Sequence, residues 1–173
     1  EEVWYSHYNI GHAYFHLGEI EKAIYYFHKA YALHPERVEN LYEIVKYYRE
    51  HGQNDLAVYY YLLGRQSMEK YKGRDYLFIQ KDVYDFKLDY EMTIIGFYTN
   101  PTNIDMRSLC MRVLGQPRAI DEGMARNVLS NYKFYTEKLR DIDTKSWEQN
   151  EWGTQLATLG KTITIADEFK NST

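Results

Sequence analysis

The feature that most constrains the fold is a set of small and aromatic residues at fixed intervals near the start of the chain. In the stretch NIGHAYFHLGEIEKAIYYFHKAYALHP, glycine and alanine stand where two antiparallel helices have to approach closely, and aromatic residues fill the space between them. A second glycine permits a tight turn and a proline ends the second helix. The pattern consists of Ile10, Gly11, Tyr14, Gly18, Ala23, Phe27, Ala30 and Pro35. It predicts a helical hairpin.

The same pattern recurs 34 positions later without a gap. Its members there are Ile44, Tyr48, Gly52, Ala57, Tyr61 and Gly64, while Val45 replaces the first small residue. Helical hairpins that repeat in this way bury their apolar faces only by stacking on their neighbours. The interval and the residue types resemble the tetratricopeptide repeat (TPR), except that His7 stands where that family usually has Trp. We therefore expect an all-α, TPR-type α-solenoid of antiparallel helix pairs with a C-terminal helical extension.

The chain beyond Tyr71 is less regular. We expect a break at KGRDY, a short extended piece after it, and helices over residues 83–99, 103–114 and 121–140. The first two of these helices fit a diverged third repeat with an insertion at the turn. Further on, WEQNEWGTQLATLG is typical of a short helix and KTITIADEF alternates like a strand. We assign a TPR-like helical repeat domain to residues 1–140 and a C-terminal extension, either an ordered tail or the start of a truncated module, to residues 141–173.

The composition excludes several classes of function. A chain of 173 residues with 45% hydrophobic and 27% charged residues suits one soluble domain, and a net charge of −4 shows no nucleic-acid footprint. No apolar run approaches the length of a membrane span, so we expect no membrane insertion. Cys110, the single cysteine, excludes an internal disulfide, favours a reducing, cytoplasmic compartment and is expected in the core. Because the chain lacks an initiator Met, we expect a fragment or a processed product.

Longer phrases resemble a narrower family. HPERVENLYEIVKYYREHG, DYLFIQKDVYDFKLDYEMTIIGFYTN and NVLSNYKFYTEKL are similar to the TPR-like segment attached to family 2-type glycosyltransferases of bacteria and large DNA viruses. The matching residues are Pro35, Arg37, Glu39, Leu41, Tyr42, Tyr48 and Arg49 in the first phrase and Leu77, Phe78, Ile79, Tyr84 and Glu91 in the second. The resemblance covers residues 4–139. It implies an accessory segment of a sugar-transferring protein rather than the transferase itself.

Transferases of this kind hold the metal of a nucleotide-sugar with an Asp-x-Asp pair that follows a strand. The one such triplet here, Asp141 to Asp143, follows a predicted helix, so a chance pair of surface acids is the better interpretation. We therefore expect no catalytic residue, no cofactor and no metal site in this chain. The alternative that it is a fragment of a glycosyltransferase stays open.

The resemblance to the repeat family also implies a concave groove lined by the first helix of each pair. The positions that face such a groove are Tyr5, Tyr8, His12, Phe15 and His16 in the first pair and Glu39, Tyr42, Lys46, Arg49 and Glu50 in the second. Tyrosine offers a large contact area at low entropic cost, so we expect the groove to bind a protein segment or a glycan acceptor. Two alternatives remain: these side chains pack against neighbouring helices, or the chain is a generic scaffold that self-associates as a homo-oligomer.

Two further groups of polar residues have structural interpretations. An ion network between repeats, structural rather than catalytic, is expected from Arg37, Glu39, Arg49, Asp89 and Glu91. His12 and His16 lie four positions apart, so both face one side of a helix and could chelate a metal. Since no third ligand is obvious, histidines that serve the structure or the groove are the favoured interpretation.

Overall fold

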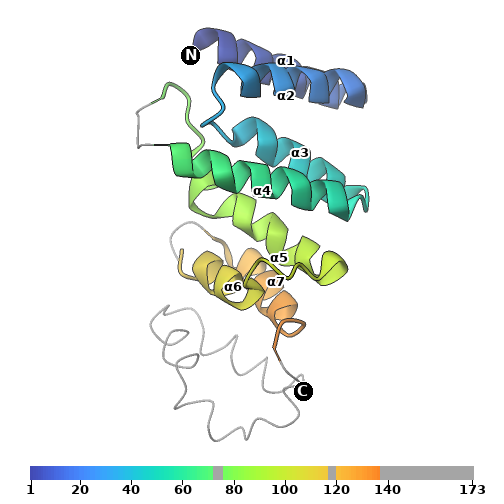
Figure 1. Ribbon diagram of the computed structural model, residues 1–173, viewed down its shortest axis with the longest axis vertical. Coiled ribbons are helices and arrows are strands. Elements are labelled where there is room, and N and C mark those ends of the chain that lie inside the picture. Colours follow the sequence, from blue (N-terminus) through green and yellow to red (C-terminus); the bar gives the residue numbers. More distant parts are fainter. Residues whose placement is uncertain (72–75, 117–119, 137–173) are drawn as a thin grey trace, which may run out of the picture. The chain divides into compact units, whose positions relative to one another are not determined.

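The computed structural model describes residues 1–71, 76–116 and 120–136 (Figure 1). The chain divides into two compact units, an N-terminal unit Glu1–Thr99 and a C-terminal unit Asn100–Thr173. In the described residues all regular secondary structure is helical, so the fold is all-α and of the TPR type. None of the helices within these residues is long and apolar enough to cross a membrane.

The first helical pair consists of α1 (Glu2–His16) and α2 (Ile20–Leu33), which lie side by side (Figure 1). Gly18 joins them with φ +73°, a backbone conformation that glycine adopts without steric cost. Gly11 lets the helices approach, because a Cβ built there would lie 2.6 Å from the Phe27 ring. The small residues of the predicted pattern, Ala23 and Ala30, are fully buried at this contact. The predicted hairpin is confirmed.

The second pair repeats this geometry with α3 (Glu39–Glu50) and α4 (Asn54–Lys70). Gly52 makes the turn with φ +70°, and Ala57 and Ile44 are fully buried. Ile44 belongs to the same apolar cluster as Phe27, so the two pairs share one core. The Asn40 amide donates to the Phe27 carbonyl at 2.9 Å and ties the pairs together. The array therefore extends by stacking, as the repeat predicts.

A third helical element closes the N-terminal unit. The predicted helix over residues 83–99 is present, but its first five residues form a π-helix, η1 (Val83–Lys87), which leads into α5 (Leu88–Thr99). α5 packs against α4 and α3. Gly64 of α4 admits the Leu88 side chain, which would lie 3.0 Å from a Cβ at that glycine. α4 ends at Lys70, and residues 72–75 of the predicted break KGRDY lie outside the described residues, while residues 76–80 have neither helix nor strand.

The C-terminal unit contains α6 (Met106–Leu114) and α7 (Glu122–Tyr132), which pack against each other. The predicted helix over residues 103–114 begins later than expected, because the Asp105 carboxylate caps it by accepting from the amides of Arg107 and Ser108. The predicted helix over residues 121–140 ends early, at Tyr132. After Tyr132 the backbone hydrogen bonds span three residues instead of four, as in a 3₁₀ turn: the Phe134 amide donates to the Asn131 carbonyl.

The remaining predictions for the C-terminal part stay predictions. Residues 137–173 lie outside the described residues, and with them the expected short helix, the expected strand and the Asp141–Asp143 pair. The expected domain boundary between residues 140 and 141 lies there too. Cys110 is fully buried in α6, as predicted, and burial raises the pKa of its thiol to about 12.

Candidate binding surface

We use the name inner surface for the side chains at the predicted groove positions of α1 and α3, together with the polar side chains of α3, η1 and α5 that contact them. It lies on α1, α3, η1 and α5 of the N-terminal unit. Of the residues predicted to line it, His16 is exposed and Tyr8 is buried with 3% of its area exposed. The half-buried ones are Tyr5, His12, Phe15, Tyr42, Lys46 and Arg49. Tyr8 and Glu39, which was also predicted there, are buried, and the role of the other residues in a ligand groove stays a prediction.

One end of the inner surface contains a fully buried ion pair. Arg37 lies just before α3 and donates to Glu39 through Nη2 at 2.7 Å and Nε at 3.3 Å. Both side chains have 0% exposure. The Trp4 ring covers the guanidinium at 3.4 Å, and the Tyr84 hydroxyl donates to Glu39 at 2.9 Å. These additional partners satisfy the buried charges, which an ion pair in the protein interior requires.

The other end contains a partly exposed ion pair. Arg49 of α3 binds Glu91 of α5, and it also reaches Glu50 at 3.2 Å. The Arg49 side chain is 21% exposed, whereas Glu91 is 4% exposed. Burial raises the pKa of Glu91, and Arg49 partly offsets that rise. This pair is therefore open to water through Arg49.

Asp89 makes a third contact, separate from the two arginine–glutamate pairs. Its carboxylate accepts from the Tyr61 hydroxyl at 2.9 Å and lies 3.5 Å from Arg65. Tyr61 and Arg65 both belong to α4. The residues of the predicted ion network thus fall into three separate contacts: Arg37 with Glu39, Arg49 with Glu91, and Asp89 with α4.

Between the two ends lies a cluster around Glu43 of α3. Its carboxylate accepts from the Tyr8 hydroxyl at 3.5 Å and lies 3.6 Å from His12 Nε2. Burial raises the pKa of Glu43, while burial and then His16 and Lys46 lower the pKa of His12. His12 is therefore neutral near pH 7, and its contact with Glu43 is polar rather than ionic. The pKa of Tyr8 is raised by burial and by Glu43, so its hydroxyl stays protonated.

Lys46 and Tyr42 flank this cluster. Lys46 is near enough to His12, Glu43 and Glu91, which come from three helices, to shift the pKa of each of them. Within the described residues it makes no ion pair. Tyr42 is half-buried, and its pKa is raised by burial and by nearby carboxylates, with Glu91 first among them. An ammonium and a phenol are therefore available at the centre of the inner surface.

The sequence reasoning missed three residues that organise this surface: Trp4, Glu43 and Gln80. Trp4 lies one turn before the position at which the repeat family has Trp, so the pattern did not single it out. Glu43 does not fall at a groove position of the repeat. Gln80 lies in the irregular stretch between α4 and η1, and its amide donates to Tyr8 at 2.7 Å. No sequence signal relates these residues to one another.

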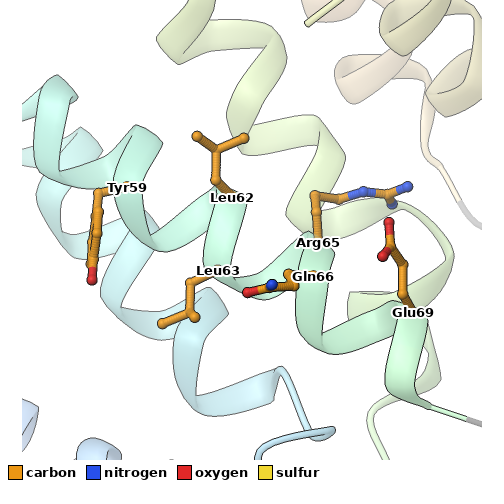
Figure 2. Close-up of a pocket in the computed structure, with 6 residues that line it drawn as sticks. All are labelled: Tyr59, Leu62, Leu63, Arg65, Gln66 and Glu69. Atoms are coloured by element: carbon orange, nitrogen blue, oxygen red, sulfur yellow. The ribbon is translucent and has the colours of Figure 1, made fainter. Parts of the chain in front are cut away.

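A separate hollow of about 470 Å³ lies on the outer side of α4. Figure 2 shows that every side chain lining it comes from that one helix. The lining residues are Tyr59, Leu62, Leu63, Arg65, Gln66 and Glu69. It is open and shallow, and the inner-surface residues do not line it. Across the described ranges, no three His, Cys, Asp or Glu side chains are grouped to hold a metal ion, and this includes His12 and His16.

These observations define the class of protein: stacked helical pairs that share a core and present a polar inner surface, an architecture that serves protein–protein interaction in general. A comparison with family models agrees. The model of the tetratricopeptide repeat matches residues 4–37, which contain most of α1, all of α2 and Arg37. The comparisons with curated proteins and with solved structures gave no match.

Proposed function

We propose that the inner surface binds an extended segment of a partner protein, and that Lys46 bonds an acidic side chain of that segment. The observation that carries this proposal is which of the basic side chains on the inner surface already have an ion-pair partner. Arg49 is paired with Glu91 and Glu50, and Lys87 lies 2.5 Å from Asp82. Lys46, by contrast, has no ion-pair partner among the described residues.

The environment of Lys46 favours a ligand carboxylate. Lys46 is half-buried, so a charge-assisted bond there is screened less by water than one at an exposed lysine. Tyr42 and His12 lie on either side and offer a phenol and a neutral imidazole for further hydrogen bonds. The charged Glu43 carboxylate repels a carboxylate of the ligand. Because burial raises the pKa of Glu43, this side chain becomes neutral at a higher pH than an ordinary glutamate. We therefore expect binding to strengthen as the pH falls towards the pKa of Glu43.

The test uses peptides selected from a random display library on the immobilised chain. We expect the enriched peptides to carry Asp or Glu. Lys46→Glu should weaken their binding at least tenfold, the factor expected when an attraction of about 1.4 kcal/mol is lost. The matched control is Lys29→Glu, which makes the same charge change at an exposed position of α2. Equal affinities for the two variants would contradict the proposal.

The alternative is that the surface serves a glycosyltransferase-type protein and binds a glycan acceptor. It is supported by the resemblance of the phrases quoted above and by Tyr42, whose ring remains half-buried at the inner surface. Of Tyr8 and Tyr42, only Tyr42 exposes enough of its ring for a sugar to stack on it, because Tyr8 is buried. A glycan array probed with the wild-type chain and with Tyr42→Ala tests this alternative. Binding of a sugar that this substitution abolishes would favour it over a protein ligand.

A generic scaffold that self-associates is the remaining possibility. Exposed aromatic residues such as Tyr25, Tyr59 and Tyr98 are available for a contact between copies. The measurement is the molar mass in solution across a range of chain concentrations. A mass that rises with concentration in the absence of any ligand would favour self-association over a groove ligand.

A further inference from the structure

The outer side of α4 is more apolar than the corresponding side of α2. Three exposed polar positions of α2 are leucines in α4, 34 residues later. The pairs are Lys22 and Leu56, His28 and Leu62, and Lys29 and Leu63. Leu56 remains 44% exposed and Leu62 remains 38% exposed. Because α2 packs in its pair without these leucines, stacking of the repeats does not account for them.

Tyr59 and Gln66 lie along the middle of this side of α4. Together with the three leucines they form what we call the outer face. Figure 2 shows Leu62 on one edge of the helix and Tyr59 and Leu63 on the other. The Tyr59 ring is 62% exposed, and the hollow of about 470 Å³ lies among these side chains. The outer face therefore offers apolar area and a recess for an aromatic side chain of a partner.

Opposite charges mark the two ends of the outer face. Asp55 lies in the first turn of α4 and Lys70 is its last residue, and both are exposed. Each lies about two helical turns from the central leucines, so both project from the same side of the helix. Neither forms an ion pair with any residue that the structure describes. The outer face thus begins with an available acid and ends with an available base.

This order of charges fits a second copy of the same chain. A two-fold axis through the middle of α4 places two outer faces together with the helices antiparallel, so that Asp55 of each copy meets Lys70 of the other. The same axis sets Tyr59 of each copy over Gln66 of the other, at the hollow. A parallel pair would instead place Asp55 against Asp55. The charges therefore favour the antiparallel arrangement.

We propose that the outer face of α4 is the interface of a weak, symmetric dimer of this chain. α4 has 17 residues and is about 25 Å long, so one helix face from each copy buries less than the roughly 1,200 Å² of a stable interface. We therefore expect a dissociation constant in the micromolar range or weaker. The inner-surface residues lie on other helices, so the dimer goes beyond the proposed function and leaves that surface available for a ligand.

The first test measures molar mass by analytical ultracentrifugation at chain concentrations up to about 1 mM. The mass should rise towards that of two chains. Tyr59→Asp should weaken dimerisation at least tenfold, because it places a carboxylate without a partner in the contact twice, once from each copy. The matched control is Tyr25→Asp, the same change at the equivalent position of α2, where the ring is 54% exposed. This control should dimerise as the wild type does.

The second test uses only the exposed charges at the ends of α4. Asp55→Lys and Lys70→Asp each bring like charges together and should weaken dimerisation about three- to tenfold. In a mixture of the two variants a heterodimer regains both ion pairs, so the mixture should associate about as strongly as the wild type. Circular dichroism checks that each variant is helical. A mixture that associates no better than either variant alone overturns the proposal.

Two results of the first test also overturn it. One is a mass that stays that of a single chain at every concentration. The other is a rise in mass that is equal in Tyr59→Asp and Tyr25→Asp, which would mean that copies meet through another surface. Lys46→Glu should dimerise as the wild type does, because Lys46 lies on α3. A rise in mass that Tyr59→Asp abolishes therefore does not count against a ligand at Lys46, and either proposal can fail alone.

Discussion

The two ends of the inner surface each contain an arginine–glutamate pair, and the two pairs differ in their access to water. Arg37 and Glu39 have no exposed area, whereas Arg49 at the other end is 21% exposed. Trp4 covers Arg37, and residues 76–80 contact the first pair, whereas no residue in the described ranges covers Arg49 in this way. The same pair of residue types is therefore a core element at one end and a surface element at the other.

This difference shows that position in the repeat does not decide the role of a residue. The residues of the glycosyltransferase-like phrases illustrate the point. Arg37 and Glu39 from the first phrase meet Leu77 and Tyr84 from the second, so these matches describe an internal contact between distant parts of the chain. The covered pair is part of the core, whereas the open pair keeps contact with water through Arg49.

The largest effect is expected from removing one charge of the covered pair. Glu39→Gln leaves the Arg37 guanidinium buried without a counter-charge and should lower the free energy of unfolding by about 3–5 kcal/mol. Glu91→Gln should cost about 1 kcal/mol, because Arg49 reaches water and keeps Glu50. Urea unfolding followed by circular dichroism measures both. Equal losses in the two variants would contradict the proposed difference between the ends.

A smaller effect is expected from two glycines at helix–helix contacts, Gly11 in the first pair and Gly64 against α5. Gly11→Ala places a Cβ 2.6 Å from the Phe27 ring, which is fully buried and cannot move aside, so it should cost about 1–3 kcal/mol. Gly64→Ala meets only the tip of the flexible Leu88 side chain at 3.0 Å, and alanine favours the helix by about 1 kcal/mol. Its stability should stay within about 1 kcal/mol of the wild type. Thermal unfolding of the two variants under identical conditions tests this contrast, and a more damaging Gly64→Ala would refute it.

The smallest effect is a difference in pH dependence between Glu36, near the covered end, and Glu43, at the open centre. Burial raises the pKa of Glu43 above 4.5. The stability that goes with this shift is fully present below pH 4.5 and is lost as the pH rises through the raised pKa. Burial is the largest single influence on the pKa of Glu36 and would raise it, but the bonds from the Tyr76 hydroxyl, the Glu36 backbone amide and His34 together outweigh it, so the net pKa is lowered. Its contribution is present above 4.5 and is lost as the pH falls below that value.

Glu43→Gln and Glu36→Gln should therefore change the pH profile of stability in opposite directions. The charged and titratable groups that face Glu43 are Tyr8, His12, Lys46, Lys87 and Glu91. They are unchanged in both variants, so the difference from wild type isolates the substituted carboxyl. Urea unfolding at a series of pH values from 3 to 8 is the measurement. Shifts of the same sign would show that the two environments are not distinct.

Much of the fold could be predicted from the sequence, because its determinants are local. Gly18 and Gly52 mark tight turns, and Gly11 with Phe27 marks a close helix contact at a fixed separation. The helix ends after Tyr71 were less certain, because a side-chain cap such as Asp105 or a tightened last turn moves a boundary by several residues. The π-helix at Val83–Lys87 had no recognisable signal.

The candidate surface could be predicted only in part. The repeat positions on α1 and α3 carry several half-buried side chains, and their contact with a ligand stays a prediction. The same positions include Tyr8, although that ring is buried. The Tyr8 ring lies in the core cluster with Trp4 and Phe27, and its hydroxyl accepts from Gln80, which follows it by 72 positions and lies in an irregular segment. Periodicity carries no information about such a contact, since it relates residues only within a repeat.

The sequence by itself determined that this chain folds into paired helices, because the spacing of small, aromatic and turn residues specifies how neighbouring helices meet. Only the tertiary structure decided which end of the inner surface is covered and which is open. The reason is physical: burial of a charge depends on what other part of the chain lies over it, and here that part is a short segment outside the repeat.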